Sequence, residues 1–241
     1  MKRIIWMVLM NLWYVPYVLT RLIRMAAHPE RYSEEERFTL IKQIDNRAIR
    51  GGRVVIDGHG MENLPEKGGF IMYPNHQGMF DVLAIFQLMT RPMSVVLKKE
   101  LAEIPFLKQV FACIGAIALD RSDPRQGMKV ILQVAEEVEK GKIFLIFPEG
   151  TRSKNGNHLL DFKGGSFKSA TKAKCPIVPV ALLDSYKAFD TGSVARQTVQ
   201  VHFLEPIPYE EYQGMKTTEI AAMVKARIEA KIAECESQEQ Q

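Results

Sequence analysis

Short apolar runs recur along the chain from residue 70 onward, and polar residues follow most of them. Runs rich in Val, Ile, Leu and Phe are typical of buried strands in a covered sheet. They occupy residues 70–73, 93–97, 114–119, 143–147, 177–181 and 198–204. Helical periodicity occurs at residues 80–88, 106–113, 124–140 and 162–173, and a charged helix is predicted over 217–234. Because strands alternate with helices, we expect an α/β fold, with a largely parallel sheet covered by helices.

The beginning of the chain has a different pattern. Residues 4–20 carry no charge and are bounded by Lys2 and Arg3 on one side and by Arg21 and Arg24 on the other. As a helix this stretch would reach about 25 Å, short of a hydrocarbon core of roughly 30 Å. Its tryptophan and tyrosine rings are of the kind that favour the headgroup level of a bilayer. A cleaved signal peptide is not expected, because the arginines stand where its cleavage site would be. We therefore expect a helix that lies in, or dips into, one leaflet.

A second N-terminal helix is predicted after this stretch. Ser33 and Glu36 have the spacing of a capping box, and the glycines at positions 51 and 52 end the pattern. The apolar positions between them are Phe38, Ile41, Ile44 and Ala48. We therefore predict a membrane-associating two-helix segment over residues 1–50 and an α/β domain over residues 51–241. The alternative is that both helices are ordinary core elements, because apolar runs shorter than about 18 residues are often buried helices.

Composition narrows the choice of partners. The 241 residues carry a net charge of +4, which suits anionic headgroups or acidic carriers and falls far short of a nucleic-acid signature. The three cysteines, at positions 113, 175 and 235, are widely spaced and form no Cys-x-x-Cys pair, which indicates a reduced, cytoplasmic setting. Together with the N-terminal pattern, this favours a monotopic or peripheral protein on the cytoplasmic face of the inner membrane.

The string Asn75-His76-Gln77-Gly78-Met79-Phe80-Asp81 contains a candidate base and its orienting acid. A histidine can take a proton from an alcohol, and a carboxylate on its other ring nitrogen fixes the tautomer. In one continuous helix, five residues at roughly 100° each would leave His76 and Asp81 about 140° apart around the axis. The pair therefore requires His76 in the turn before the helix and Asp81 inside it. A loop histidine bonded to backbone is the simple alternative for this string alone.

The string Phe147-Pro148-Glu149-Gly150-Thr151-Arg152-Ser153 follows another predicted central strand. Its polar residues would emerge at the carboxyl end of that strand, where open α/β sheets bind their ligands. Arg152 offers a planar fork of donors suited to phosphate, and Gly150 lets backbone amides approach closely. The alternative is a structural pair between Glu149 and Arg152 that closes a loop.

With both strings, the sequence resembles the glycerolipid acyltransferase family. Residues 115–121, Gly-Ala-Ile-Ala-Leu-Asp-Arg, look like a further block of that family, and residues 177–181, Ile-Val-Pro-Val-Ala, look like another. The blocks stand in the family's order between about residues 75 and 181, and the stretch from Lys98 to Pro105 also matches what the family carries there. The combination is specific, whereas the last block alone is not.

The resemblance implies an acyl transfer in which His76 deprotonates an acceptor hydroxyl and Asp81 orients the base. The residues that it implies for binding the acceptor phosphate are Lys99, Arg121, Glu149 and Arg152, with Asn75, Lys98, Gly150 and Thr151 in support. The implied substrates are lysophosphatidic acid, which would become phosphatidic acid, and a fatty acyl thioester of acyl carrier protein or coenzyme A. No metal, further cofactor or nucleic acid is expected.

Other readings stay open at this point. The alternative to direct transfer is an acyl-enzyme on Ser153, Ser166 or Cys113, although none stands in a Gly-x-Ser-x-Gly elbow. Within the family, the acceptor could instead be another lysophospholipid, glycerol 3-phosphate or a lyso-ornithine lipid. Two alternatives belong to other functional classes. One is a metal-dependent phosphoesterase using His76, Asp81, Glu149 and His158, and the other is a non-catalytic lipid-binding module on the membrane surface.

Overall fold

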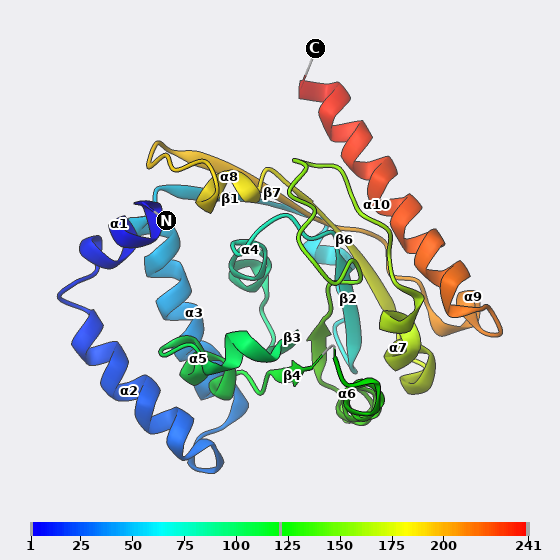
Figure 1. Ribbon diagram of the computed structural model, residues 1–241, viewed down its shortest axis with the longest axis horizontal. Coiled ribbons are helices and arrows are strands. Elements are labelled where there is room, and N and C mark those ends of the chain that lie inside the picture. The colour runs from blue at the N-terminus through cyan, green and yellow to red at the C-terminus, as the bar shows by residue number, and fades with distance from the viewer. Residues whose placement is uncertain (1, 121, 240–241) are drawn as a thin grey trace.

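The fold is built on a sheet whose strands mostly run in one direction (Figure 1). The computed structural model describes residues 2–120 and 122–239, and within these ranges the sheet has seven strands in the order β1-β7-β6-β2-β5-β3-β4. They are β1 (Val54–His59), β2 (Phe70–Pro74), β3 (Met93–Lys98), β4 (Ile117–Leu119), β5 (Ile143–Leu145), β6 (Ile177–Leu183) and β7 (Gln197–Phe203). Strands β6, β2, β5, β3 and β4 are parallel, whereas β7 is antiparallel to β6 and parallel to β1. The predicted largely parallel sheet is confirmed.

Two strands differ from the prediction. β1 was not predicted, because Asp57 and Gly58 interrupt its apolar pattern and both have low β propensity. It is tolerated at the edge of the sheet, where only β7 pairs with it. β4 begins only at Ile117, because Gly115 adopts a left-handed conformation with φ of 64° and turns the chain after helix α5.

Helices cover both faces of the sheet (Figure 1). They are α1 (Lys2–Met10), α2 (Val15–Ala27), α3 (Glu34–Gly51), α4 (Asp81–Leu88), α5 (Leu107–Cys113), α6 (Pro124–Glu139), α7 (Lys168–Ala173), α8 (Tyr186–Phe189), α9 (Tyr209–Tyr212) and α10 (Thr217–Glu239). Short 3₁₀ turns occur at η1 (Pro29–Arg31), η2 (Met61–Asn63), η3 (Lys99–Glu103) and η4 (Gly164–Phe167). One core contains Phe70 and Met72 of β2 together with residues of α1–α5 and α8, and the other contains Ile71 and Tyr73 with α6, α7, α9 and α10.

The N-terminal segment contains a break that the sequence prediction missed. We expected one helix over residues 4–20, but α1 and α2 are separate helices bent by 98° relative to each other. Pro16 stands in the first turn of α2, where it can begin a helix but cannot continue one. The capping box at the start of α3 is confirmed, since Ser33 and Glu36 bond each other's backbone N–H groups.

The first helix is tied to the rest of the molecule by a buried arginine. The Arg3 guanidinium donates hydrogen bonds to the carbonyl oxygens of Ala188 at 2.7 Å, Gly52 at 2.5 Å and Ala195 at 2.8 Å. Its side chain is almost fully buried, and burial lowers its pKa from the ordinary value. The segment therefore docks on the α/β part through a polar contact as well as through the apolar core.

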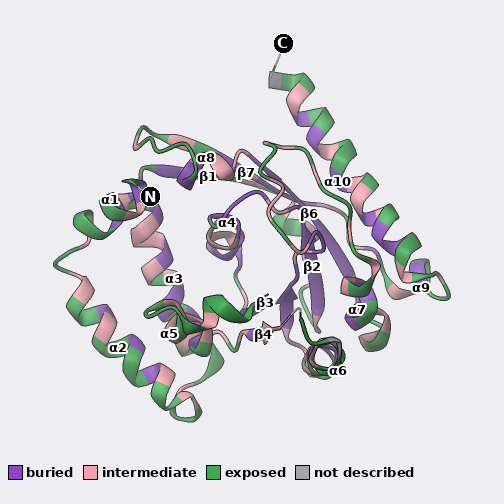
Figure 2. Cartoon of the chain, in the orientation of Figure 1, coloured by how far each residue is buried: buried purple, intermediate pink, exposed green. Residues whose placement is uncertain are grey.

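The outward side of this segment is apolar. The exposed side chains of α1, α2 and the turn between them include Ile5, Val8, Leu9, Met10, Leu12, Trp13, Tyr17 and Ile23, and Figure 2 shows both helices largely in the colours of exposed and intermediate residues. Within the described part of the chain, no single helix has the length and apolar composition to cross a bilayer, and α1 with α2 meets that criterion only as a bent pair.

Candidate active site

The parallel strands bring the polar residues of several loops to one edge of the sheet. His76 follows β2, Lys99 follows β3, Asp120 follows β4 and Glu149 lies just beyond β5. These strands are neighbours and point in the same direction, so their carboxyl ends meet. The predicted collection of polar groups at a single sheet edge is therefore present.

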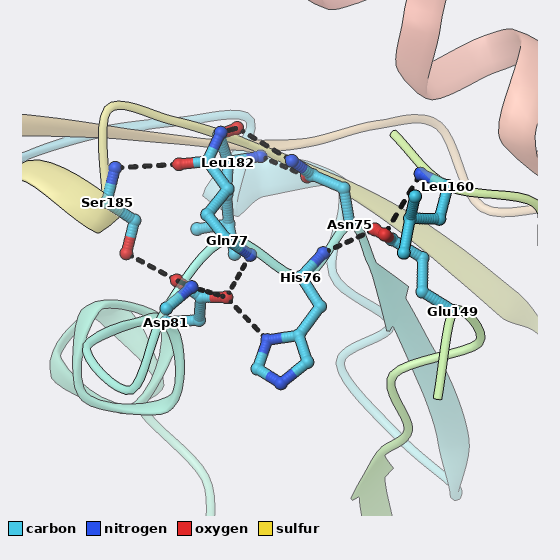
Figure 3. A network of polar contacts seen from close by, with 9 residues as sticks. Asn75, His76, Gln77, Asp81, Glu149, Leu160, Leu182 and Ser185 are labelled. Carbon is cyan, nitrogen blue, oxygen red and sulfur yellow. Dashed lines mark hydrogen bonds and ion pairs between the residues drawn. The ribbon is translucent and has the colours of Figure 1, made fainter. Parts of the chain in front are cut away.

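His76 and Asp81 form a close pair (Figure 3). His76 Nδ1 lies 2.8 Å from Asp81 Oδ2, with His76 in the turn after β2 and Asp81 as the first residue of α4. A carboxylate only accepts hydrogen bonds, so Nδ1 carries the proton and Nε2 is left as the basic nitrogen. The imidazole stacks on the Phe147 ring, with 4.0 Å between centroids. The geometry expected from the spacing is confirmed.

Asp81 is held as a buried acceptor. Its side chain is 0% exposed, against 20% for His76. Oδ2 also accepts from the backbone N–H groups of Gln77 at 2.7 Å and Gly78 at 3.0 Å. Oδ1 accepts from the Ser185 hydroxyl at 2.6 Å. These donors and the N-terminus of α4 compensate for the loss of water around a negative charge.

The Glu149 carboxylate, which the sequence suggested for the phosphate site, accepts hydrogen bonds from backbone groups of the protein. It accepts from the backbone N–H of His76 at 2.7 Å and of Leu160 at 3.0 Å, and the residue is buried. Burial raises its pKa, and these N–H donors oppose the rise. No ion pair joins it to Arg152 in the part of the chain that the structure describes. Glu149 therefore fixes the loop that carries His76.

Asn75 is also engaged within the protein. Its amide donates to the Leu182 carbonyl at 3.0 Å and accepts from the Leu182 N–H at 2.7 Å, which ties the end of β2 to β6. Gly150 was expected to support the site through its backbone. That backbone is in the left-handed region, with φ of 72°. Thr151 is exposed beside it.

The expected cations follow different strands of the sheet. Arg152 is half-buried in the loop after β5. Lys98 pairs with Glu100 at 2.8 Å, and Lys99 lies 3.5 Å from Asp120, at the ends of β3 and β4. Arg121, which follows Asp120, lies outside the described residues.

Several residues of the site were missed by sequence reasoning. Ser185 follows β6 as His76 follows β2, so the strand-end rule could have found it. Gln77 donates to Asn157 Oδ1 at 2.8 Å and accepts from the Ser185 N–H at 2.8 Å, which no local pattern predicts. The Lys163 ammonium lies across Gly150, 3.0 Å from where a Cβ on that glycine would stand. It adds a positive charge beside the loop of Arg152.

Two alternatives are less well supported by the geometry. Within residues 2–120 and 122–239, no three His, Cys, Asp or Glu side chains converge in a way that could hold a metal ion. Cys113 lines a cavity of about 260 Å³ with Met93 and Ile143, at the amino ends of β3 and β5 and thus at the edge opposite His76. Burial raises the pKa of its thiol to about 11, which disfavours the nucleophilic thiolate.

A histidine backed by a buried carboxylate, at the carboxyl edge of a parallel sheet, defines the class: an α/β protein with a candidate base. Comparison with known proteins identifies the family. The Acyltransferase family model matches residues 55–183. The 1-acyl-sn-glycerol-3-phosphate acyltransferases of Salmonella typhimurium and Escherichia coli are each 33% identical over 172 residues, covering 71% of this chain and 70% of theirs. The chain therefore belongs to the acyltransferase family.

A solved structure supports the fold. The 1-acyl-sn-glycerophosphate (LPA) acyltransferase PlsC from Thermotoga maritima aligns with a TM-score of 0.78, covering 97% of this chain and 95% of that one. At 23% identity this likeness concerns the fold alone. It confirms the α/β architecture together with the N-terminal helices.

Proposed function

We propose that this acyltransferase moves a fatty acyl group from an acyl carrier protein or coenzyme A thioester to the sn-2 hydroxyl of 1-acyl-glycerol-3-phosphate, giving phosphatidic acid. The observation that carries the proposal is the 2.8 Å contact between His76 Nδ1 and Asp81 Oδ2, which leaves Nε2 as the base. The relatives named after this reaction support the choice of acceptor.

In the proposed reaction, Nε2 of His76 takes the proton of the acceptor hydroxyl as its oxygen attacks the thioester carbonyl. Asp81 stabilises the imidazolium that forms. The tetrahedral intermediate collapses, the carbon–sulfur bond breaks, and the thiolate takes the proton back from Nε2. Backbone amides near Gly150 are candidates to stabilise the oxyanion. The products are the acylated acceptor and the free thiol, with the base restored.

The acceptor and donor are tested by one matrix of assays on the purified chain. Thiol release and lipid product are measured with coenzyme A and acyl carrier protein thioesters against four acceptors: lysophosphatidic acid, glycerol 3-phosphate, other lysophospholipids and a lyso-ornithine lipid. We expect the highest kcat/KM with lysophosphatidic acid. A clear preference for another acceptor would replace the proposed one, and thiol release independent of any acceptor would exclude transfer.

The direct route is distinguished from the covalent one by mass. Ser153 is a candidate serine in a loop bonded to that of His76, since its N–H donates to the His76 carbonyl at 2.8 Å. Protein incubated with acyl thioester alone is expected to keep its intact mass. An added acyl group that disappears on addition of acceptor would establish an acyl-enzyme instead.

Arg152 is proposed to bind the acceptor phosphate, together with Lys163, whose ammonium lies across Gly150, and with Lys99 and Arg121. Arg152→Ala is expected to raise KM for the acceptor about 10- to 100-fold, since a bond between charged groups contributes roughly 1.5–3 kcal/mol. KM for the thioester should change little. Lys172→Ala removes an exposed charge from the last turn of α7, near the amino end of β6, and serves as the control. An unchanged acceptor KM in Arg152→Ala would remove this residue from the phosphate site.

We also propose that the exposed apolar side of α1 and α2 binds the cytoplasmic surface of the inner membrane, as a monotopic or peripheral segment. Leu9, Leu12 and Trp13 are 57%, 60% and 73% exposed. Each is of a type whose burial is worth about 1.5–3 kcal/mol. The variant Leu9→Ser, Leu12→Ser, Trp13→Ser is therefore expected to lose at least about tenfold in binding to phospholipid vesicles.

Flotation with phosphatidylethanolamine and phosphatidylglycerol vesicles measures this binding. Substitution is preferable to deletion of the segment, because Arg3 and Met7 are buried against the domain. Met128→Ser with Leu132→Ser changes exposed apolar positions of α6 and is the control. Undiminished flotation of the folded triple variant would show that another surface binds the membrane.

A further inference from the structure

Ser185 stands at the N-cap position of a helix but does not cap it with its side chain. It immediately precedes α8, the position at which a serine hydroxyl usually accepts a hydrogen bond from a backbone N–H of the first turn. Its side chain makes no such cap. Instead the hydroxyl donates to Asp81 Oδ1 at 2.6 Å, and the residue is 0% exposed. The hydroxyl therefore binds the same carboxylate that contacts His76.

The two oxygens of Asp81 differ in their partners. Oδ2 accepts hydrogen bonds from His76 Nδ1 and from the backbone N–H groups of Gln77 and Gly78. Among the described residues, Oδ1 receives only the Gly78 N–H at 3.1 Å, shared with Oδ2, and the shorter bond from Ser185. The serine therefore fixes the rotation of the carboxylate about its Cβ–Cγ bond, and with it the direction in which Oδ2 faces the imidazole.

Ser185 is itself held in place (Figure 3). Its N–H donates to Gln77 Oε1 at 2.8 Å, and the Gln77 amide donates to the Leu182 carbonyl at 3.0 Å and to Asn157 Oδ1 at 2.8 Å. Asp184, just before it, has φ of 63°, a left-handed conformation that a non-glycine residue adopts at a cost. The turn after β6 is thus built to present this hydroxyl.

We propose that Ser185 is a positioning residue for the His76–Asp81 pair: it orients the carboxylate without touching either substrate. This inference rests on the proposed function, in which that pair is the base. When a side chain that hydrogen-bonds a functional group loses its own hydrogen-bond partner, the activity typically falls about 10- to 100-fold. The loss should fall on kcat, because the geometry of the proton transfer changes while the contacts with the substrates remain.

The test measures steady-state kinetics of Ser185→Ala, Ser185→Cys and Ser185→Thr with both substrates varied. We expect Ser185→Ala to lower kcat about 10- to 100-fold with both KM values unchanged. Ser185→Cys keeps a similar volume with a weak donor and should lose activity similarly, whereas Ser185→Thr keeps the hydroxyl and should recover part of it. In an Asp81→Asn background, Ser185→Ala should cost much less than in the wild type.

Ser94→Ala is the matched control. Ser94 is buried and its hydroxyl donates to the Gly115 carbonyl at 2.7 Å, at the amino end of β3, so the variant also loses a buried bond but should keep kcat. The inference is overturned if folded Ser185→Ala stays within about twofold of wild-type kcat, if its loss appears in KM, or if Ser94→Ala loses as much. If Ser185→Ala fails to fold, Ser185→Cys decides by the same criteria. Failure of the proposed function is separate: the wild type would show no acyl transfer, or His76→Ala would remain active.

Discussion

Replacing His76 with alanine is expected to leave a folded protein that has lost about 10²- to 10⁴-fold in turnover, the usual contribution of a general base. No other imidazole among the described residues is paired with Asp81. The residues that hold the loop act mainly through backbone groups of His76, since Glu149 accepts from its N–H and the Ser153 N–H donates to its carbonyl. Removal of the imidazole should therefore leave the loop in place. Thiol release from an acyl thioester in the presence of lysophosphatidic acid measures the loss.

His158→Ala provides the comparison for this result. His158 is exposed in the loop between β5 and α7, and its replacement should leave turnover near the wild-type rate. The turnover of Asp81→Asn should lie between those of His158→Ala and His76→Ala or close to that of His76→Ala, because an amide does not stabilise the imidazolium as a carboxylate does. If His76→Ala keeps more than about a tenth of wild-type turnover, the proton must be removed by another group, and the assignment of the base is wrong.

The sheet and the contact between His76 and Asp81 could be predicted because local rules determine both. Apolar runs followed by polar residues mark strand ends, and the five-residue spacing between His76 and Asp81 permits contact in only one arrangement of turn and helix. The pair is also stabilised locally, by the N–H groups of Gln77 and Gly78. These bonds lie within one short segment, so the pairing could be predicted from that segment alone, although Glu149 and Ser185 from distant parts of the chain also hold it.

The features that were missed depend on contacts between distant segments. Ser185 and Asp81 are separated by 104 positions in the chain, and His76 and Glu149 by 73. Nothing in the string around Glu149 indicates that its carboxylate will bind backbone rather than substrate. The bend between α1 and α2 has the same origin in part, since the amide of Asn11, in the turn after α1, donates to the Arg47 carbonyl of α3 as well as to the Met7 carbonyl of α1. Such features follow from packing, which a pattern along one segment does not contain.

Helix α3 contains a further example, a buried acid on the face that the sequence predicted to be apolar. Asp45 is 6% exposed, and neither carboxylate oxygen has a hydrogen-bond partner among the described residues. Burial raises its pKa from 3.8 to about 8, which the positive charge of Lys42 only partly opposes. Lys42, one turn away, donates to the Met89 carbonyl instead. Asp45 is therefore protonated in the folded protein near neutral pH and ionised in the unfolded chain.

Asp45→Asn is accordingly expected to stabilise the protein, and to do so increasingly as the pH rises. The folded state binds a proton that the unfolded state has lost, so this group makes the free energy of unfolding fall as pH increases from about 4 to about 8. At pH 7 the cost is about 4 kcal/mol, from roughly three pH units at about 1.4 kcal/mol each. The asparagine amide is also buried without partners, which costs about 1–3 kcal/mol, so the net gain is smaller, about 1–3 kcal/mol.

The pH dependence separates this effect from packing. Urea unfolding of the wild type and Asp45→Asn at pH 5, 6, 7 and 8 should show a difference in unfolding free energy that grows by about 1.4 kcal/mol per pH unit up to pH 7 and levels off near pH 8. Glu35→Gln removes an exposed carboxylate from the same helix and should show no comparable growth, because water solvates that charge in both states. A constant difference for Asp45→Asn would mean that the buried carboxylate stays ionised on folding, which would require a counter-charge nearer than Lys42. A difference that grows with pH would instead show that ionisation of this one group destabilises the folded protein.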